Sequence, residues 1–239
     1  MSAPSKNSIE IVGKYMSYLS WNQLVVGYSH KKCLINPFSG EVTQPGIYAI
    51  MGQNGCGKST LLKTWLGLLR PVSGSVYLND APIPTEHNIS QGIAYVPQFH
   101  AVNRYFHISV QDFIKQGRGP QYKFAENDYH EITNLLSEWQ LSGYENRSFH
   151  EMSGGQKTRV MIVRAIISKP KILFLDEPLA SLDICCQQQL MDTLEELTQA
   201  HKVCVFIVDH HLENFKNYLT TRFYFTRKHD QEISSVILK

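Results

Sequence analysis

The stretch that decides the fold is residues 47–60, which reads IYAIMGQNGCGKST. The five apolar residues 47–51 have the length and composition of a buried strand. They lead directly into residues 52–59, which fit the pattern G-x-x-x-x-G-K-[ST]. Residues 59–69 then carry apolar side chains at helical spacing and stop before Pro71, because proline cannot continue a helix. Strand, glycine-rich loop and helix in this order predict a phosphate-binding loop within an α/β fold.

The residue types in this loop suit a nucleoside triphosphate. Glycines let the backbone wrap phosphates closely with N–H groups pointing inward, and the helix N-terminus adds roughly half a positive charge. Lys58 is expected to reach the β- and γ-phosphates, and the Ser59 hydroxyl to ligate Mg²⁺. The alternative is a glycine-rich turn before a core helix. The predicted nucleotide-binding residues of the loop are Gly52, Gln53, Asn54, Gly55, Cys56, Gly57, Lys58, Ser59 and Thr60.

Two acids follow a second apolar run, Lys171–Leu175. Such a run is typical of a parallel strand that is buried on both faces, and ligands of open α/β sheets bind beyond the carboxyl ends of the strands. Asp176 and Glu177 are therefore expected to face the phosphate loop. Asp176 suits the shell of a magnesium ion, and Glu177 suits the polarisation of the water that attacks the γ-phosphate. The alternative is a strand that ends in solvated acids.

A second anion-binding element is predicted at residues 153–156. Ser153 and Gln156 form an S-x-x-Q capping box at the start of a helix, and Gly154 and Gly155 between them leave the backbone amides bare. One nucleotide cannot easily use both this helix start and the phosphate loop of the same molecule. The simplest resolution is a head-to-tail dimer, in which each ATP is held by the loop of one subunit and the capped helix of the other.

The remaining pattern extends the α/β interpretation over most of the chain. Residues 1–19 are taken as an N-terminal extension, residues 20–239 as one nucleotide-binding domain, and residues from about 101 to 155 as an inserted helical subdomain. Further strands are predicted at Leu24–Tyr28, Ser75–Leu78, Ile93–Val96 and Val203–Val208. Further helices are predicted at Val110–Gln116, Asn127–Trp139, Gln156–Ser168 and Cys185–Ala200. Apolar strands that alternate with helices indicate a parallel sheet covered on both faces.

Composition narrows the function classes. The 239 residues carry 23 Lys and Arg against 21 Asp and Glu, which is too even for a nucleic-acid-binding protein. No apolar run approaches the roughly 18 residues that a membrane span requires. The polar N-terminus lacks the layout of a signal peptide. The five cysteines show no CxxC spacing, so neither a disulfide framework nor a zinc site is predicted and a reducing cytoplasm is expected.

With these motifs in place, the sequence closely resembles the ABC ATPase family from about Ser20 onward. The family signature LSGGQ is present with Met152 in its first position, and the motifs occur in the family's order. The resemblance implies an ATPase with a P-loop NTPase core, in which helices flank a mostly parallel sheet. It also implies an N-terminal antiparallel β subdomain and the inserted helical subdomain.

The resemblance also implies roles for residues outside these motifs. Tyr28 matches the aromatic residue that stacks on adenine, and Gln98 the glutamine that touches magnesium and links to the helical subdomain. Residues 181–183 match the loop that crosses the dimer interface. His210 matches the histidine that contacts the γ-phosphate. The family usually has a small or polar residue before this histidine and an acid after it, whereas this chain has Asp209-His210-His211, so His211 could share the role. A metal site at the tandem histidines is a less favoured alternative, because adjacent side chains on an extended chain point apart.

Taken together, the predicted catalytic residues are Lys58, Gln98, Glu177 and His210, and the predicted Mg²⁺ ligands are Ser59, Gln98 and Asp176. Residues 102–112 resemble the zinc, manganese and iron(II) uptake branch of the family, with His107 in place of a usual proline. The expected function is therefore ATP-driven import of zinc or manganese by a homodimer at the cytoplasmic face of the inner membrane. A transmembrane permease and an extracytoplasmic substrate-binding protein are the expected partners. Alternatives are iron-chelate or haem uptake, efflux, and a nucleotide-dependent regulatory dimer that does not transport.

Overall fold

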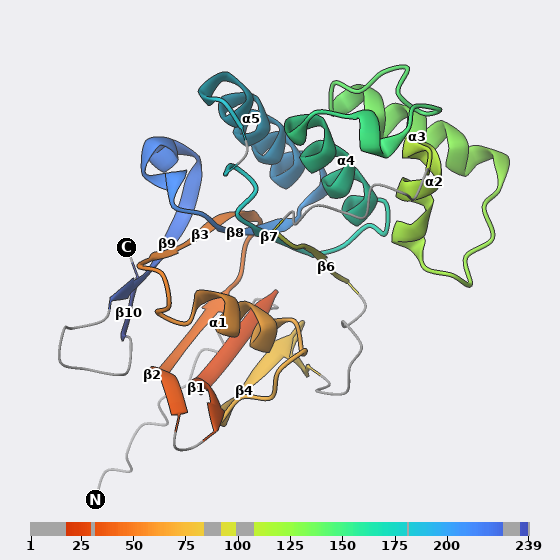
Figure 1. Cartoon of the computed structure of the whole chain (residues 1–239). Coiled ribbons are helices and arrows are strands. Elements are labelled where there is room, and N and C mark those ends of the chain that lie inside the picture. The colour runs from red at the N-terminus through yellow and green to blue at the C-terminus, as the bar shows by residue number, and fades with distance from the viewer. Residues whose placement is uncertain are drawn as a thin grey trace, which may run out of the picture.

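The computed structural model describes residues 18–29, 32–83, 92–98, 108–180, 182–226 and 235–238. Two sheets organise these residues (Figure 1). The six-stranded sheet has the order β10-β9-β3-β8-β7-β6, and its strands are parallel except where β10 pairs with β9. These strands are β3 (Gly46–Gly52), β6 (Ile93–Val96), β7 (Ile172–Asp176), β8 (Cys204–Val208), β9 (Leu219–Thr226) and β10 (Ser235–Leu238).

The second sheet is antiparallel and has the order β2-β1-β4-β5. It lies with α1 (Lys58–Trp65) on one side of the six-stranded sheet, and α4 (Gly154–Ile166) and α5 (Ile184–His201) lie on the other (Figure 1). Its strands are β1 (Leu19–Ser29), β2 (Lys32–Val42), β4 (Ser73–Leu78) and β5 (Ala81–Pro82). The predicted sheet covered on both faces is confirmed.

Strict alternation of side chains along the central strands divides the interior into two cores. Leu173 and Leu175 of β7 belong to the core beneath α4 and α5. Ile172 and Phe174, between and beside them, belong to the core shared with α1 and the antiparallel sheet. Because successive side chains of a strand point to opposite faces, a continuous apolar run is what a doubly covered strand requires.

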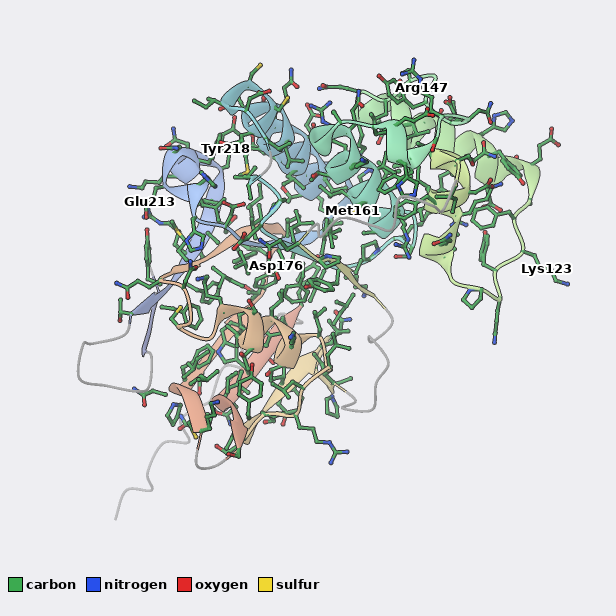
Figure 2. All side chains as sticks on the ribbon, in the orientation of Figure 1. Lys123, Arg147, Met161, Asp176, Glu213 and Tyr218 are labelled. Atoms are coloured by element: carbon green, nitrogen blue, oxygen red, sulfur yellow. The ribbon has the colours of Figure 1, made fainter. Side chains whose placement is uncertain are left out.

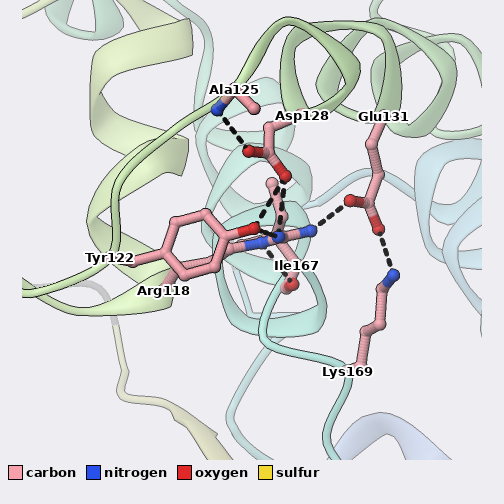
Figure 3. A network of polar contacts seen from close by, with 7 residues as sticks. All are labelled: Arg118, Tyr122, Ala125, Asp128, Glu131, Ile167 and Lys169. Carbon is pink, nitrogen blue, oxygen red and sulfur yellow. Dashed lines mark hydrogen bonds and ion pairs between the residues drawn. The ribbon is translucent and has the colours of Figure 1, made fainter.

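The helical insertion lies between β6 and α4. It contains α2 (Val110–Lys115), η1 (Gln116–Arg118), α3 (Glu126–Glu138) and η2 (Phe149–Glu151). A partly buried polar network joins this insertion to the core (Figure 3). The Arg118 guanidinium donates to Asp128 Oδ1 at 2.8 Å and to the Ile167 carbonyl at 3.2 Å, and it also pairs with Glu131. Lys169, in the turn before β7, reaches the other oxygen of Glu131 at 3.0 Å. The insertion is thereby anchored to the turn that leads into the acidic strand.

Several element limits differ from the sequence prediction. The helix expected at 59–69 ends at Trp65, because Gly67 adopts a left-handed φ of +75° that ends the helix before Pro71 is reached. The strand β1 begins at Leu19, the last residue assigned to the N-terminal extension. The sequence did not predict strands β2, β5, β9 and β10. Residues 102–107 of the segment that resembles the metal-uptake branch lie outside the described residues.

Candidate nucleotide-binding and hydrolytic site

The phosphate loop runs from the end of β3 to the start of α1, as the sequence predicted. Gly52, Gly55 and Gly57 all have positive φ, at +143°, +77° and +101°. A Cβ at Gly52 would lie 2.5 Å from the Phe225 carbonyl oxygen, so this glycine is required both for its conformation and for close packing against β9. Residues 53–55 and Ser59 are exposed, and ligand oxygens can therefore approach them from solvent.

We expect Gly52→Ala to lower the free energy of unfolding by more than the about 1–3 kcal/mol that one strained backbone position costs, because the added Cβ would also meet the Phe225 carbonyl oxygen. Urea denaturation followed by far-UV circular dichroism measures it. Gly55→Ala is the matched control, since its φ is also positive but an added Cβ would have nothing within 4 Å. Equal stability losses in the two variants would contradict the packing argument.

Lys58 folds back over its own loop. Its Nζ donates to the carbonyls of Gly52 at 2.8 Å and Gln53 at 2.9 Å, and lies 4.0 Å from Cys56 Sγ. The lysine is buried, with 7% of its surface exposed. A buried ammonium group needs such acceptors. The geometry places a positive charge directly in the loop that is expected to receive phosphates.

Tyr28 ends β1 at the rim of this region. Its ring is 62% exposed, and its hydroxyl lies 3.5 Å from Thr60 Oγ1 in the first turn of α1. The Lys32 ammonium lies 5.7 Å from the centre of the ring. A large exposed aromatic residue beside the phosphate-loop helix is of the kind on which a planar base can stack.

Asp176 is the last residue of β7, and Glu177 follows it directly. Asp176 is half-buried and lies at the level of the six-stranded sheet, between α1 on one side and α4 and α5 on the other (Figure 2). It accepts a hydrogen bond of 3.3 Å from the Tyr95 hydroxyl. Burial raises the pKa of Asp176, and the neighbouring Glu177 charge adds to this effect while Tyr95 and Lys58 oppose it. Burial together with Asp176 also raises the pKa of Tyr95 to about 12. The carboxylate is thus poorly compensated within the chain, as a cation ligand would be.

Two of the other predicted catalytic side chains, Gln98 and His210, lie beside Glu177. Gln98 Nε2 donates to Glu177 Oε2, and His210 Nε2 lies 3.8 Å from Glu177 Oε1. The backbone of Glu177 is left-handed, with φ of +50°, and its N–H donates to the Val208 carbonyl at 2.7 Å. Side chains that follow β6 and β8 therefore meet the carboxylate that follows β7. Non-glycine residues held in this conformation are often found at active sites.

The tandem histidines have different surroundings. His210 lies beside Glu177, whereas His211 Nδ1 lies 2.8 Å from Asp209 Oδ1. Asp209 is buried and its second oxygen accepts from the Leu179 amide at 2.9 Å. Among the described residues, no group of three or more His, Cys, Asp or Glu is gathered in a way that could hold a metal ion. The arrangement favours His210 as the histidine of the nucleotide site. It gives no support to a metal site at the tandem histidines.

The capping box at the start of α4 is confirmed. The Gln156 amide donates to Ser153 Oγ at 3.3 Å, and the Ser153 amide donates to Gln156 Oε1 at 3.0 Å. Gln156 Nε2 also donates to the Tyr144 hydroxyl of the helical insertion at 3.0 Å. A Cβ at Gly155 would lie 2.9 Å from Leu182 Cδ2, so the helix start packs closely against the loop before α5. These contacts join the helix start to the helical insertion and to the loop before α5, and among the described residues none of them reaches the phosphate loop.

Sequence reasoning missed three polar residues that organise the site: Tyr95, Asp209 and Gln187. Tyr95 bonds Asp176, and Asp209 bonds the loop after Glu177. Gln187 in α5 is buried and its Nε2 donates to the carbonyls of Leu179 at 3.1 Å and Leu182 at 3.2 Å. Asp209 had a detectable signal, an acid at the end of the buried strand β8. The other two have none in the sequence alone.

The fold and the phosphate loop define a P-loop domain of the α/β class, in which a carboxylate lies beyond a central strand. A family model described as ABC transporter matches residues 35–180. The manganese transport system ATP-binding protein of Halalkalibacterium halodurans is 36% identical over 179 residues, covering 73% of this chain and 70% of the relative. The chain belongs to the ABC transporter family, as its ATP-hydrolysing domain.

Two further relatives bear on function. The molybdate import ATP-binding protein of Haemophilus influenzae is 33% identical, covering 80% of this chain and 72% of the relative. A solved structure assigned to the metal-chelate type of ABC transporter, in an inward-facing conformation, has a TM-score of 0.74 and 30% identity. It covers 87% of this chain and 79% of that one. In the described part of the chain, no helix is long and apolar enough to cross a membrane.

Proposed function

We propose that this ATPase drives the import of a divalent transition metal, zinc or manganese, through a separate membrane permease. The observation that carries the proposal is the 36% identity to a manganese transport ATP-binding protein over most of both chains. The segment at 102–112 adds sequence support from within the chain. The permease, an extracytoplasmic substrate-binding protein and a position on the cytoplasmic face of the membrane are parts of the same proposal.

Within the site, each side chain has one proposed task. Tyr28 stacks on adenine, the amides of residues 52–60 and Lys58 hold the phosphates, and Glu177 accepts a proton from the attacking water. His210 steadies charge on the γ-phosphate, and Gln98 orients Glu177. The support is geometric, since Gln98 follows β6, His210 follows β8, and both lie beside the Glu177 carboxylate. Positioning and charge stabilisation are what phosphoryl transfer requires of a protein.

The residues also fit Mg²⁺. Asp176 has one long hydrogen bond and a raised pKa because of burial, so a cation would compensate its charge. Ser59 is exposed at the first turn of α1, and Gln98 lies beside Glu177. The proposed ligands are therefore Ser59, Gln98 and Asp176. When bound, the ion neutralises phosphate charge during transfer.

The capped helix start supports a head-to-tail dimer. Ser153 and Gln156 satisfy each other, while Ser153 and Gly154 are exposed. The bare amides of this helix start remain available to an anion. Because the element packs on the helical side of its own chain, the proposed anion is the γ-phosphate of ATP bound to a second copy. Closure of two copies on two ATP molecules then moves the helical insertions, and these act on the permease.

The test is elemental analysis of cells whose only copy carries Glu177→Gln, grown in metal-poor medium. A selective fall in zinc or manganese, severalfold relative to wild type, is expected because transport stops when ATP is not hydrolysed. Unchanged metal content, with the variant still binding ATP, would overturn the metal assignment and leave the ATPase in place.

A second cargo class is favoured by specific observations. The molybdate-import relative and the metal-chelate-type structure are 33% and 30% identical, close to the manganese relative. A fall in molybdenum, or in chelated iron or haem, in the same elemental analysis would move the proposal to that class. Accumulation instead of loss would indicate efflux.

A further inference from the structure

Asp209 is a buried carboxylate whose two oxygens bind different parts of the site. It follows directly after β8, and 1% of its surface is exposed. Its Oδ2 accepts a hydrogen bond of 2.9 Å from the Leu179 amide. Its Oδ1 accepts from the His211 amide at 2.9 Å and lies 2.8 Å from His211 Nδ1. Burying a charge is unfavourable unless its acceptor positions are filled, and here three donors fill them.

The Leu179 amide belongs to the segment that carries the catalytic carboxylate. Glu177, two residues earlier, has a left-handed backbone. This conformation is unfavourable for a residue other than glycine, so contacts with the surroundings must stabilise it. The end of β8 and the residue after it stabilise this segment through two hydrogen bonds. The Val208 carbonyl accepts from the Glu177 amide at 2.7 Å, and the next residue, Asp209, accepts from the Leu179 amide.

The same segment is held from its other side by α5. Gln187 Nε2 donates to the carbonyls of Leu179 and Leu182. Leu179 is therefore fixed at its N–H by Asp209 and at its C=O by Gln187. Both of these side chains are buried, at 1% and 6% exposed. Neither of them reaches the phosphate loop in the contacts described above.

We propose that Asp209 is a positioning residue for ATP hydrolysis, which fixes the loop after Glu177 through the Leu179 amide and thereby aims the Glu177 carboxylate. The proposal rests on the proposed hydrolytic role of Glu177. It requires an ionised carboxylate, because both oxygens must accept. An asparagine of the same shape has one oxygen and one amide group, so either the Leu179 amide or the His211 donors would face an N–H group.

The contacts of Asp209 also indicate different tasks for the two histidines. Asp209 holds the His211 ring and amide, while His210 is left beside Glu177. His211 thus completes the environment of Asp209 and takes no part in contacting phosphate.

The experiment compares Asp209→Asn with wild type as full-length protein. We expect kcat for ATP to fall about tenfold, the effect of losing one hydrogen bond to a charged group, while the dissociation constant for ATP stays within about twofold. Hydrogen exchange, measured by mass spectrometry, should accelerate in residues 179–182 and stay unchanged in β3. A residue that serves only stability would accelerate exchange throughout the core and leave kcat of the folded protein unchanged, and that result would overturn the proposal.

Asp192→Asn is the matched control, because this exposed aspartate of α5 bonds Gln188 and Tyr218 away from Glu177. It should keep the wild-type kcat. The variant His211→Ala separates the contact of Asp209 with the His211 ring from its contact with the Leu179 amide. It removes the ring contact but keeps the Leu179 bond, so its effect on kcat should be smaller than that of Asp209→Asn. An equal effect would overturn the assignment to Leu179.

If Asp209→Asn does not fold, Gln187→Leu tests the same loop from α5. It should lower kcat, spare ATP affinity and accelerate exchange at residues 179–182, and an unchanged kcat would overturn the proposal. Failure of the proposed function has a different signature. Glu177→Gln would then keep turnover, while the exchange measurement would still show whether Asp209 holds the loop.

Discussion

Glu177→Gln is expected to lower kcat for ATP hydrolysis by a factor on the order of 10²–10³, the usual contribution of a general base. Glutamine has the same shape and keeps an oxygen that can accept from Gln98, so the local structure should persist. It cannot accept a proton from water. Affinity for ATP should stay unchanged, since the phosphate-binding groups at Lys58 and residues 52–60 are untouched. Phosphate release by the chain, alone or with its permease, measures kcat, and a fluorescent ATP analogue measures affinity.

The control makes the same chemical change at Glu138, an exposed residue at the end of α3. Glu138→Gln should leave both quantities unchanged. If Glu177→Gln keeps turnover within about threefold of wild type, Glu177 is not the general base and has no part in the mechanism. Wild-type turnover that Glu177→Gln abolishes would exclude the purely regulatory dimer. Absence of turnover in wild type, even with a permease, would favour it.

The elements that sequence could predict are those that local chemistry specifies. The phosphate loop, the strand before the acids and the capped helix start each combine a composition with a fixed spacing, and each lies where it was predicted. Strand β2 was missed for the opposite reason. It contains Pro37 and Gly40, lacks a regular alternation, and is held as an edge strand by pairing with β1. Proline is tolerated there because an edge strand has one unpaired side.

The predicted roles of single residues depend on contacts that the sequence does not show. Tyr95 and Asp176 are 81 positions apart, and Leu179 and Asp209 are 30 apart. The fold creates these pairs by placing β6, β7 and β8 next to one another. The sequence showed that the order Asp209-His210-His211 was unusual, but only the buried surroundings of Asp209 separated the two histidines. Local signals thus identified the chemistry, and tertiary contacts indicated how the side chains are held.

Asp176 is a proposed Mg²⁺ ligand whose buried charge also lowers the stability of the fold. Its carboxylate is partly buried, and within the described part of the chain it accepts a long hydrogen bond of 3.3 Å from the Tyr95 hydroxyl. Its pKa is raised above the ordinary value of a free aspartate, mainly by burial. A carboxyl group with a raised pKa in the folded state stabilises the fold below its unfolded pKa, and this contribution is lost as pH rises through the folded pKa. At neutral pH the ionised group therefore opposes folding in the absence of nucleotide and metal.

Asp176→Asn is accordingly expected to abolish activity while stabilising the fold. The amide removes the buried charge and can still accept from Tyr95, so without ATP and Mg²⁺ the variant should unfold at higher urea than wild type at pH 7. The difference should shrink as pH falls through the raised pKa of wild-type Asp176, because its carboxyl group then becomes protonated and loses its charge. ATP turnover should fall on the order of 10²-fold or more because the proposed cation ligand is gone. Asp112→Asn is the control of opposite sign, since hydrogen bonds from Lys115 and Ser109 lower the pKa of Asp112 and its loss should slightly destabilise at pH 7. An Asp176→Asn protein less stable than wild type would show that Asp176 is held by compensating contacts and is a structural residue.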